Sequence, residues 1–138
     1  MLANYHTHTF RCRHAVGQDR EYVETAVARG LQVLGFSDHV PMVFADGHES
    51  NFRVPVGQLE DYVNSVLSLR DEFKADIDVR LGFEMEYYPD TFEDTWRSSG
   101  PIPWTTCCWR ATSTTAGRPS TTPPWPRIGP PFIPTWTG

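Results

Sequence analysis

The stretch Asn4-Tyr-His-Thr-His-Thr-Phe-Arg-Cys-Arg-His14 is the most informative part of this chain. It places several histidines directly after the apolar residues at the start of the sequence, which is the pattern of a strand that ends in a binding site. It holds three of the five histidines of the chain. Residues i and i+2 of a β-strand point to the same side, so His6 and His8 at a strand end aim at one point in space. Convergent imidazoles are what a metal ion needs, although a lone His-x-His pattern also occurs among ordinary surface histidines.

Two later parts of the chain repeat this pattern of an apolar run followed by residues that bind metals. The three runs of strand length span residues 2–6, 31–36 and 78–83, and they end in His6/His8, Asp38/His39 and Glu84/Glu86. Three strand ends with the same chemistry favour a metal site over chance placement. Imidazole together with carboxylate suits zinc, manganese or iron better than calcium.

The segments between these runs carry apolar residues at helical spacing. One helix is expected from near Arg20 to Gly30, with Asp19 as its cap, a second over 57–73, and a short third from Pro89 towards Trp96. The β-α-β-α-β-α order predicts an α/β fold with a parallel sheet or barrel. In such folds the active site lies at the carboxyl ends of the strands, where all three sets of metal-binding residues fall.

Several histidines that share a carboxylate are typical of multinuclear hydrolase sites, which activate water near neutral pH and hold the oxygens of a phosphate ester. Glu84 could bridge two ions. Arg11, Arg13 and Arg53 are candidates to bind the phosphate, since guanidinium groups match its oxygens, but each could also be a solvated surface residue. Cys12 is interpreted as a packing residue and not as a nucleophile.

Composition limits the partners and the compartment. The chain of 138 residues has a net charge of −5, so it lacks the basic field that gathers nucleic acid. No apolar run reaches the length of a membrane span, and the start has no signal-peptide pattern. Three cysteines give no disulfide framework. These features predict a cytoplasmic protein with neither nucleic acid nor membrane as a partner.

The motifs together resemble the PHP (polymerase and histidinol phosphatase) family, and most of all its histidinol-phosphatase branch. The resemblance is carried by His6-Thr-His8, Arg11-Cys-Arg-His14-Ala, Gly35-Phe-Ser-Asp-His39-Val-Pro41 and Gly82-Phe-Glu84-Met-Glu-Tyr-Tyr-Pro89. It covers about residues 1–100. Each motif is weak alone, but three in order at strand ends are specific.

This resemblance implies the N-terminal portion of a distorted (β/α)7 barrel, with divalent metal ions that are normally three per site in the family. The implied metal ligands are His6, His8, His14, His39 and Glu84. Glu84 and Asp38 are the implied catalytic carboxylates, the first as a bridge between ions and the second as a support for His39. The implied reaction is hydrolysis of L-histidinol phosphate, a small-molecule phosphate ester, in histidine biosynthesis.

Other activities stay open on the sequence alone. One is a different phosphoesterase or a polymerase-associated nuclease of the same family. The other is a non-catalytic fragment that only binds metal. The family pattern continues after Glu84 with further histidines and a late Asp/His pair, whereas this sequence has no His or Asp after Asp94.

The composition changes near residue 100, which divides the chain into residues 1–100 and 101–138. The second segment holds nine of the twelve prolines and no acidic residue. It is predicted to be an irregular, disordered tail, and we interpret it as the product of a frameshift. A one-base shift lets the codons of Trp104–Ser113 encode Asp-Tyr-Leu-Leu-Leu-Ala-Gly-His-Phe, which looks like the next strand of the family with its metal-binding histidine. A genuine Pro/Thr-rich disordered tail is the alternative.

Overall fold

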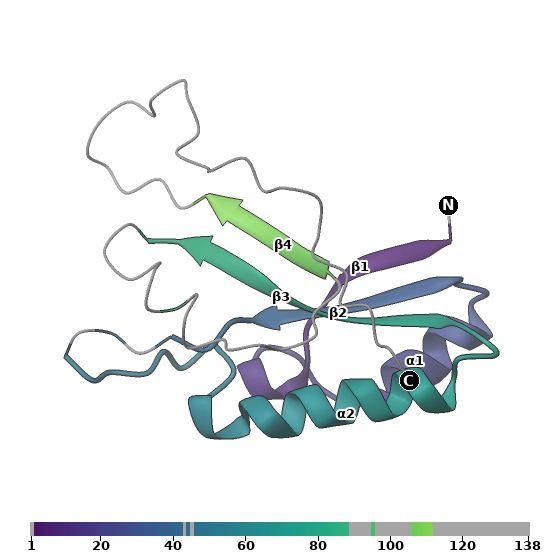
Figure 1. The fold of residues 1–138 in the computed structure, drawn as a ribbon, viewed down its shortest axis with the longest axis horizontal. Coiled ribbons are helices and arrows are strands. Elements are labelled where there is room, and N and C mark those ends of the chain that lie inside the picture. The colour runs from purple at the N-terminus through teal and green to yellow at the C-terminus, as the bar shows by residue number, and fades with distance from the viewer. Residues whose placement is uncertain (1, 43, 45, 89–94, 96–105, 112–138) are drawn as a thin grey trace, which may run out of the picture.

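The computed structural model describes residues 2–42, 44, 46–88, 95 and 106–111, the last six by their backbone alone. Its elements follow one another as strand, helix, strand, helix, strand and strand (Figure 1). They are β1 (Ala3–Thr7), the 3-10 helix η1 (Phe10–Cys12), α1 (Asp19–Ala28), β2 (Val33–His39), the 3-10 helix η2 (Val56–Gln58), α2 (Leu59–Glu72), β3 (Asp78–Tyr87) and β4 (Thr106–Ala111). The alternation confirms the α/β fold expected from the sequence.

The four strands form one parallel sheet in the order β1-β2-β3-β4. Its register pairs Val33 with Asp78 at one end and His39 with Glu84 at the other. Because all the strands run the same way, their carboxyl ends share one edge of the sheet. The strand ends that carry the predicted ligands therefore lie side by side.

Gly35 in β2 allows β1 to approach closely. A Cβ atom at this position would lie 3.0 Å from Cα of Tyr5, which is tighter than ordinary van der Waals contact. Glycine is thus the residue that fits where the backbone of β1 lies this close to its neighbour β2. This close approach helps to bring the end of β1, with its histidines, against the end of β2.

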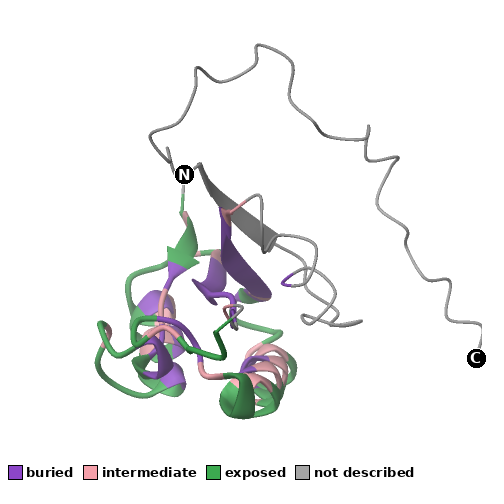
Figure 2. Ribbon diagram, turned by 90° about the vertical axis from the view of Figure 1, so that its left-hand side faces the viewer, coloured by how far each residue is buried: buried purple, intermediate pink, exposed green. Residues whose placement is uncertain are grey.

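Both long helices cover the same face of the sheet, and the core lies between the two layers (Figure 1). Figure 2 shows buried residues along β2 and β3 and on the inner sides of the helices, whereas β1 and the outer sides of the helices are largely exposed. The fully buried core residues include Val23 of α1, Tyr62 and Val66 of α2, and Phe36 and Phe83 of the sheet. No helix in the described part of the chain is both long and apolar enough to cross a bilayer.

The helix ends differ in detail from the expected ones. Gln18, and not Asp19, precedes the first turn of α1, and its backbone N–H donates to the Glu21 carboxylate at 2.6 Å. Asp19 is buried and binds Arg11 instead, so its carboxylate serves tertiary structure and not the cap. Gly30 has φ +72°, the left-handed conformation expected just after α1.

The strand β4 lies inside the segment 101–138, for which the sequence predicts no regular structure. At Thr106–Ala111 that prediction is wrong, because these residues pair in parallel with Gly82–Tyr87 of β3. Thr, Cys and Trp suit strands, and the free edge of β3 offers hydrogen-bond partners. The helix predicted from Pro89 towards Trp96 lies outside the described residues except for Thr95.

Candidate metal centre

The carboxylate of Glu84 is the point on which three strand ends converge. Its Oε2 atom lies 3.1 Å from Nε2 of His6, 3.3 Å from Nε2 of His8 and 3.5 Å from Nδ1 of His39. The side chain of Glu84 is 7% exposed. A single buried carboxylate oxygen therefore faces one imidazole from β1, one from the residue just after β1, and one from β2.

His8 stands at the centre of a group of imidazoles. Its ring centroid lies 5.0 Å from that of His6, and 4.7 Å from those of both His14 and His39. His14 and His39 are themselves 5.1 Å apart. Four of the five histidines of the chain thus lie in one cluster, as the sequence predicts, while His48 packs beside Phe44 in the loop after β2.

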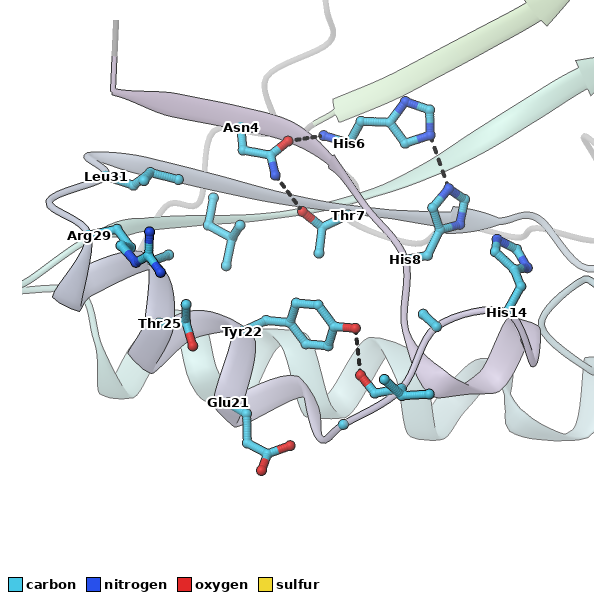
Figure 3. A pocket seen from close by; sticks show the side chains of 15 residues that line it. Asn4, His6, Thr7, His8, His14, Glu21, Tyr22, Thr25, Arg29 and Leu31 are labelled. Carbon is cyan, nitrogen blue, oxygen red and sulfur yellow. Dashed lines mark hydrogen bonds between the residues drawn. The ribbon is translucent and has the colours of Figure 1, made fainter.

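The shortest contact between ring atoms in this cluster joins His6 and His8. Their Nε2 atoms lie 3.0 Å apart, as the dashed line in Figure 3 marks. These two nitrogens and Oε2 of Glu84 all lie within 3.3 Å of one another. In the metal-free chain, a proton on one imidazole lets it donate a hydrogen bond to its neighbours, and a cation could take the place of that proton.

His39 is the most enclosed member of the cluster. Its side chain is 8% exposed, and Nδ1 has no hydrogen-bond partner among the described residues. Burial lowers the pKa of His39, in spite of the nearby Glu84 carboxylate, which acts to raise it. A neutral imidazole with an unsatisfied buried nitrogen is the form that binds a metal ion.

Cys12 and His14 form a second possible ligand group with His8. The ligand atoms of these three residues all lie within 4.8 Å of one another, as do those of His6, His8 and Glu84. However, the Cys12 thiol donates to the backbone carbonyl of Thr9 at 3.0 Å. Burial raises the pKa of Cys12 to about 11, so it is a neutral thiol near pH 7. Packing, as predicted from the sequence, is the role that these contacts support.

Asp38 holds the segment that follows β1. Its Oδ2 atom accepts hydrogen bonds from the backbone N–H of Thr9 at 3.1 Å and from the Thr9 hydroxyl. Its Oδ1 atom lies 3.4 Å from Nδ1 of His8 and accepts the backbone N–H of His39 at 2.9 Å. The sequence predicts support for His39, whereas the Asp38 carboxylate faces the ring of His8 and only the backbone of His39.

The three arginines predicted to bind phosphate lie in different environments. Arg11 is buried, and its guanidinium donates to Asp19 and Asp61. Arg13 is exposed at the turn that ends η1, with φ +65°. Arg53 is buried, and its guanidinium donates to Glu86 and to the Val40 carbonyl. Arg53 is linked to the cluster through its partner Glu86, which also approaches His39.

Glu86 is a residue of this site that the sequence analysis places at the strand end without giving it a role. Its Oε1 atom lies 3.7 Å from Nδ1 of His39, and its other oxygen pairs with Arg53 and accepts the Tyr88 hydroxyl at 3.0 Å. Residues i and i+2 of a strand share a face, so the position of Glu86 relative to Glu84 is the signal that could have found it.

The residues present fit a metal ion. Ligand atoms of a tetrahedral site with bonds of about 2.0–2.1 Å lie roughly 3.4 Å apart. The separations of 3.0, 3.1 and 3.3 Å among His6, His8 and Glu84 are close to that value. The orphaned Nδ1 of His39 adds a buried donor atom next to them. Imidazoles with carboxylate are the donor set of zinc, manganese and iron sites.

The cluster opens onto a groove between β1 and α1 with a volume of about 730 Å³ (Figure 3). His6, His8 and His14 line one end of the groove, Tyr22 of α1 lies near its middle, and Arg29, just after α1, lies at the other end. The side chain of His6 is 51% exposed. A small solute can therefore reach the histidines from this side of the described structure.

Comparisons with known proteins identify relatives of this chain. The PHP domain family matches residues 4–116. A Deinococcus radiodurans protein named "Probable histidinol-phosphatase" is 35% identical over 103 residues, which are 75% of this chain and 39% of that protein. The histidinol-phosphatase of Bacillus subtilis is 29% identical over 93 residues, which are 64% of this chain and 34% of that protein. The chain thus spans less than half the length of these relatives.

Solved structures show the same fold. The crystal structure of histidinol phosphate phosphatase from Lactococcus lactis, complexed with zinc, L-histidinol and phosphate, has a TM-score of 0.63 at 22% identity. The superposition covers 78% of this chain and 38% of that one. A structure from Listeria monocytogenes gives a TM-score of 0.65 at 20% identity, covering 78% and 43%. The parallel sheet with helices on one face is therefore part of a larger known fold.

Proposed function

Because the chain belongs to the PHP domain family, we propose that its histidine and glutamate cluster binds divalent metal ions and serves the hydrolysis of L-histidinol phosphate. The products are L-histidinol and inorganic phosphate, and the setting is histidine biosynthesis in the cytoplasm. The observation that carries this proposal is the convergence of His6, His8 and His39 on one oxygen of Glu84. Both curated relatives bear a histidinol-phosphatase name.

The proposed ligands divide into two overlapping groups. His6 and His8 with Glu84 form one group, and His14 and His39 form a second group beside His8, with His39 also 3.5 Å from Glu84. Glu84 would be the carboxylate shared between ions in this scheme. Manganese, iron and zinc are the candidates, with three ions in a complete family site; zinc is the metal named for the Lactococcus lactis structure.

Bound metals would supply an activated water at neutral pH and positive charge for the phosphate oxygens. The residues of this chain hold the ligands in place. Asp38 fixes the ring of His8 through Nδ1, which leaves Nε2 for the metal side. Glu86 lies 3.7 Å from Nδ1 of His39, and its ion pair with Arg53 limits the negative charge near an incoming phosphate. Arg13, which is exposed, is the proposed phosphate contact, since a guanidinium matches phosphate oxygens. Arg53 is buried and donates to Glu86 and Val40, so it acts on the site through Glu86.

The composition of the sequence after Glu84 favours a second candidate function, which is metal binding without turnover. The chain covers 39% and 34% of its curated relatives. After Glu84, the sequence as given supplies no further histidine to the site. In this case the cluster would bind metal through the same residues, but substrate contacts from the rest of a barrel would be missing.

The experiment that tests the proposal measures binding and turnover separately. The purified chain is stripped with a chelator and titrated with Mn²⁺ or Zn²⁺, and phosphate release from L-histidinol phosphate is then followed. Binding with release that Glu84→Gln abolishes supports the phosphatase. Binding without release supports the second candidate. An unchanged titration curve for Glu84→Gln contradicts both, and Glu72→Gln on the exposed side of α2 is the matched control.

A parallel assay distinguishes a small phosphate ester from DNA as the substrate. DNA ends and L-histidinol phosphate are offered under the same metal conditions. Release from DNA alone would place the activity with another branch of the family and overturn the proposed substrate.

A further inference from the structure

Arg11 connects the loop that carries His14 to both helices. Nη1 donates to the two oxygens of Asp19 at 3.0 and 2.8 Å, while Nε and Nη2 donate to Oδ2 of Asp61 at 2.9 and 2.7 Å. Asp19 is the first residue of α1, and Asp61 lies in the first turn of α2. The Ser65 hydroxyl donates to Asp19 at 2.6 Å and closes the network.

The guanidinium is enclosed as well as paired. Arg11 is 4% exposed, and its Cζ lies 4.5 Å from the ring centroid of Phe10 and 5.7 Å from that of Tyr62. Burial acts to lower the pKa of Arg11, but the hydrogen bonds to Asp61 and Asp19 outweigh it and raise the pKa. All three nitrogens of the group are committed to protein carboxylates, so this side chain serves structure and not phosphate.

The segment that Arg11 anchors is a single short turn, which Asp38 holds at Thr9 and the buried Cys12 holds from within. The segment is η1, which lies between His8 and His14 and ends at Arg13 with a left-handed backbone. Nδ1 of His14 contacts the Cys12 carbonyl at 3.2 Å. The place of the His14 ring beside His8 and His39 therefore depends on where η1 sits.

We propose that Arg11 is a positioning residue: by binding α1 and α2 at once, it sets η1 so that His14 faces His8 and His39. This inference rests on the proposed function, in which His14 is a metal ligand. The device needs a guanidinium, because one edge of the planar group meets Asp19 while the other meets Asp61. A lysine presents a point charge and cannot hold both carboxylates in a fixed orientation.

Asp61 offers the sharpest test, because it is exposed and lies on a helix away from the imidazoles. Its side chain is 68% exposed, so Asp61→Asn can weaken the anchor without opening the core. Asp71→Asn on the same helix is the matched control, since Asp71 is 75% exposed and, within the described part of the chain, its ion pair is with the neighbouring Arg70. Asp61→Glu, which keeps the charge, is the conservative variant.

The main measurement is competition of the stripped chain with a chromophoric chelator for Zn²⁺. We expect Asp61→Asn to lower zinc affinity by about 10-fold, and Arg11→Lys by at least as much, with Asp71→Asn unchanged and Asp61→Glu near the parent value. Urea unfolding of each variant accompanies the titration. Equal zinc affinity in Asp61→Asn and in the parent chain would overturn the proposal, and so would a matching loss in Asp71→Asn.

A second readout requires no metal. Amide hydrogen exchange of residues 10–14 is followed in the stripped chain, where we expect Asp61→Asn to speed exchange in this segment and to leave β2 and β3 unchanged. If the parent chain binds no zinc, the proposed function fails, while this exchange still decides whether Arg11 fixes the turn. Unaltered exchange in the segment would contradict the positioning role.

Discussion

The Asp38 carboxylate contacts both His8 and Thr9: Oδ1 lies 3.4 Å from Nδ1 of His8, and Oδ2 accepts the backbone N–H and the hydroxyl of Thr9. Through these bonds, the end of β2 fixes the segment that follows β1. The ring of His8 then presents Nε2 to Glu84 at 3.3 Å. A carboxylate behind a ligand imidazole selects the tautomer and the orientation that a metal needs.

Asp38→Asn should therefore weaken metal binding more than it weakens the fold. An amide keeps the shape but cannot accept at both atoms, so His8 loses its orienting partner. We expect zinc affinity to fall by about 10- to 100-fold, measured by chelator competition on the stripped chain. Asp46→Asn, in an exposed loop, is the control. Parent-like affinity in Asp38→Asn would contradict this role.

The same carboxylate predicts how the stability of the metal-free chain depends on pH. Burial acts to raise the pKa of Asp38, but hydrogen bonds from His8 and Thr9 outweigh it and hold the pKa below the ordinary value of 3.8. A carboxyl with a depressed folded-state pKa stabilises the fold above its unfolded pKa, and this contribution is lost as pH falls through the folded value. Urea unfolding from pH 5 downward should show the free energy of unfolding falling less steeply in Asp38→Asn than in the parent. The same pH dependence of the free energy of unfolding in both proteins would contradict a lowered pKa for Asp38.

Tyr62 should contribute to stability through its hydroxyl. The group is fully buried, donates to the Gly82 carbonyl at 2.8 Å and accepts the backbone N–H of Asp38 at 3.4 Å. Tyr62→Phe removes both of these hydrogen bonds from a fully buried position, so we expect a loss of about 1–2 kcal/mol in urea unfolding. Tyr22→Phe, whose hydroxyl bonds the Val16 carbonyl at the surface, should change stability by less than about 0.5 kcal/mol. An equal loss of stability in Tyr62→Phe and Tyr22→Phe would contradict this role of the Tyr62 hydroxyl.

The sequence predicts the layers of the fold and the convergence of the proposed ligands, because both follow from periodicity. Alternating strands and helices force a parallel sheet, and a parallel sheet brings His8, His39 and Glu84 to one edge. The partners of Arg11 do not follow from periodicity. Helical spacing places Asp61 on the polar side of its helix, but nothing local indicates that a residue fifty positions earlier reaches it.

Glu86 and Asp38 show the same limit. Sequence spacing puts Glu86 on the face of Glu84, yet its neutralisation by Arg53 depends on the path of the loop after β2. Asp38 precedes His39, which makes support of that histidine the natural local expectation. The carboxylate instead turns to β1, because Thr9 and His8 offer it three hydrogen-bond contacts there.

Cys12 should be protected from alkylation in the folded, metal-free chain. The residue is 0% exposed, and burial raises the pKa of its thiol from 9.0 to about 11. The thiolate fraction at pH 8 then falls by about 100-fold, before steric protection is counted. Timed iodoacetamide labelling with peptide mass spectrometry should find the Cys12 peptide slow in the native chain and fast in urea. Equal rates in both states would contradict the burial.

The last prediction concerns the reading frame after about Pro101, where we propose that the partial PHP domain of residues 1–100 gives way to a frameshift product. The strand β4 ends at Ala111, beside Tyr87 of β3. The shifted frame encodes Leu-Leu-Leu-Ala-Gly over this strand and puts its histidine on the codons of Ala111 and Thr112, at the edge where the other ligands gather. Resequencing the gene from the codon of Ser98 onward should restore that frame and reveal later His and Asp motifs. A confirmed sequence without them would instead favour the Pro/Thr-rich tail and the non-catalytic metal-binding chain.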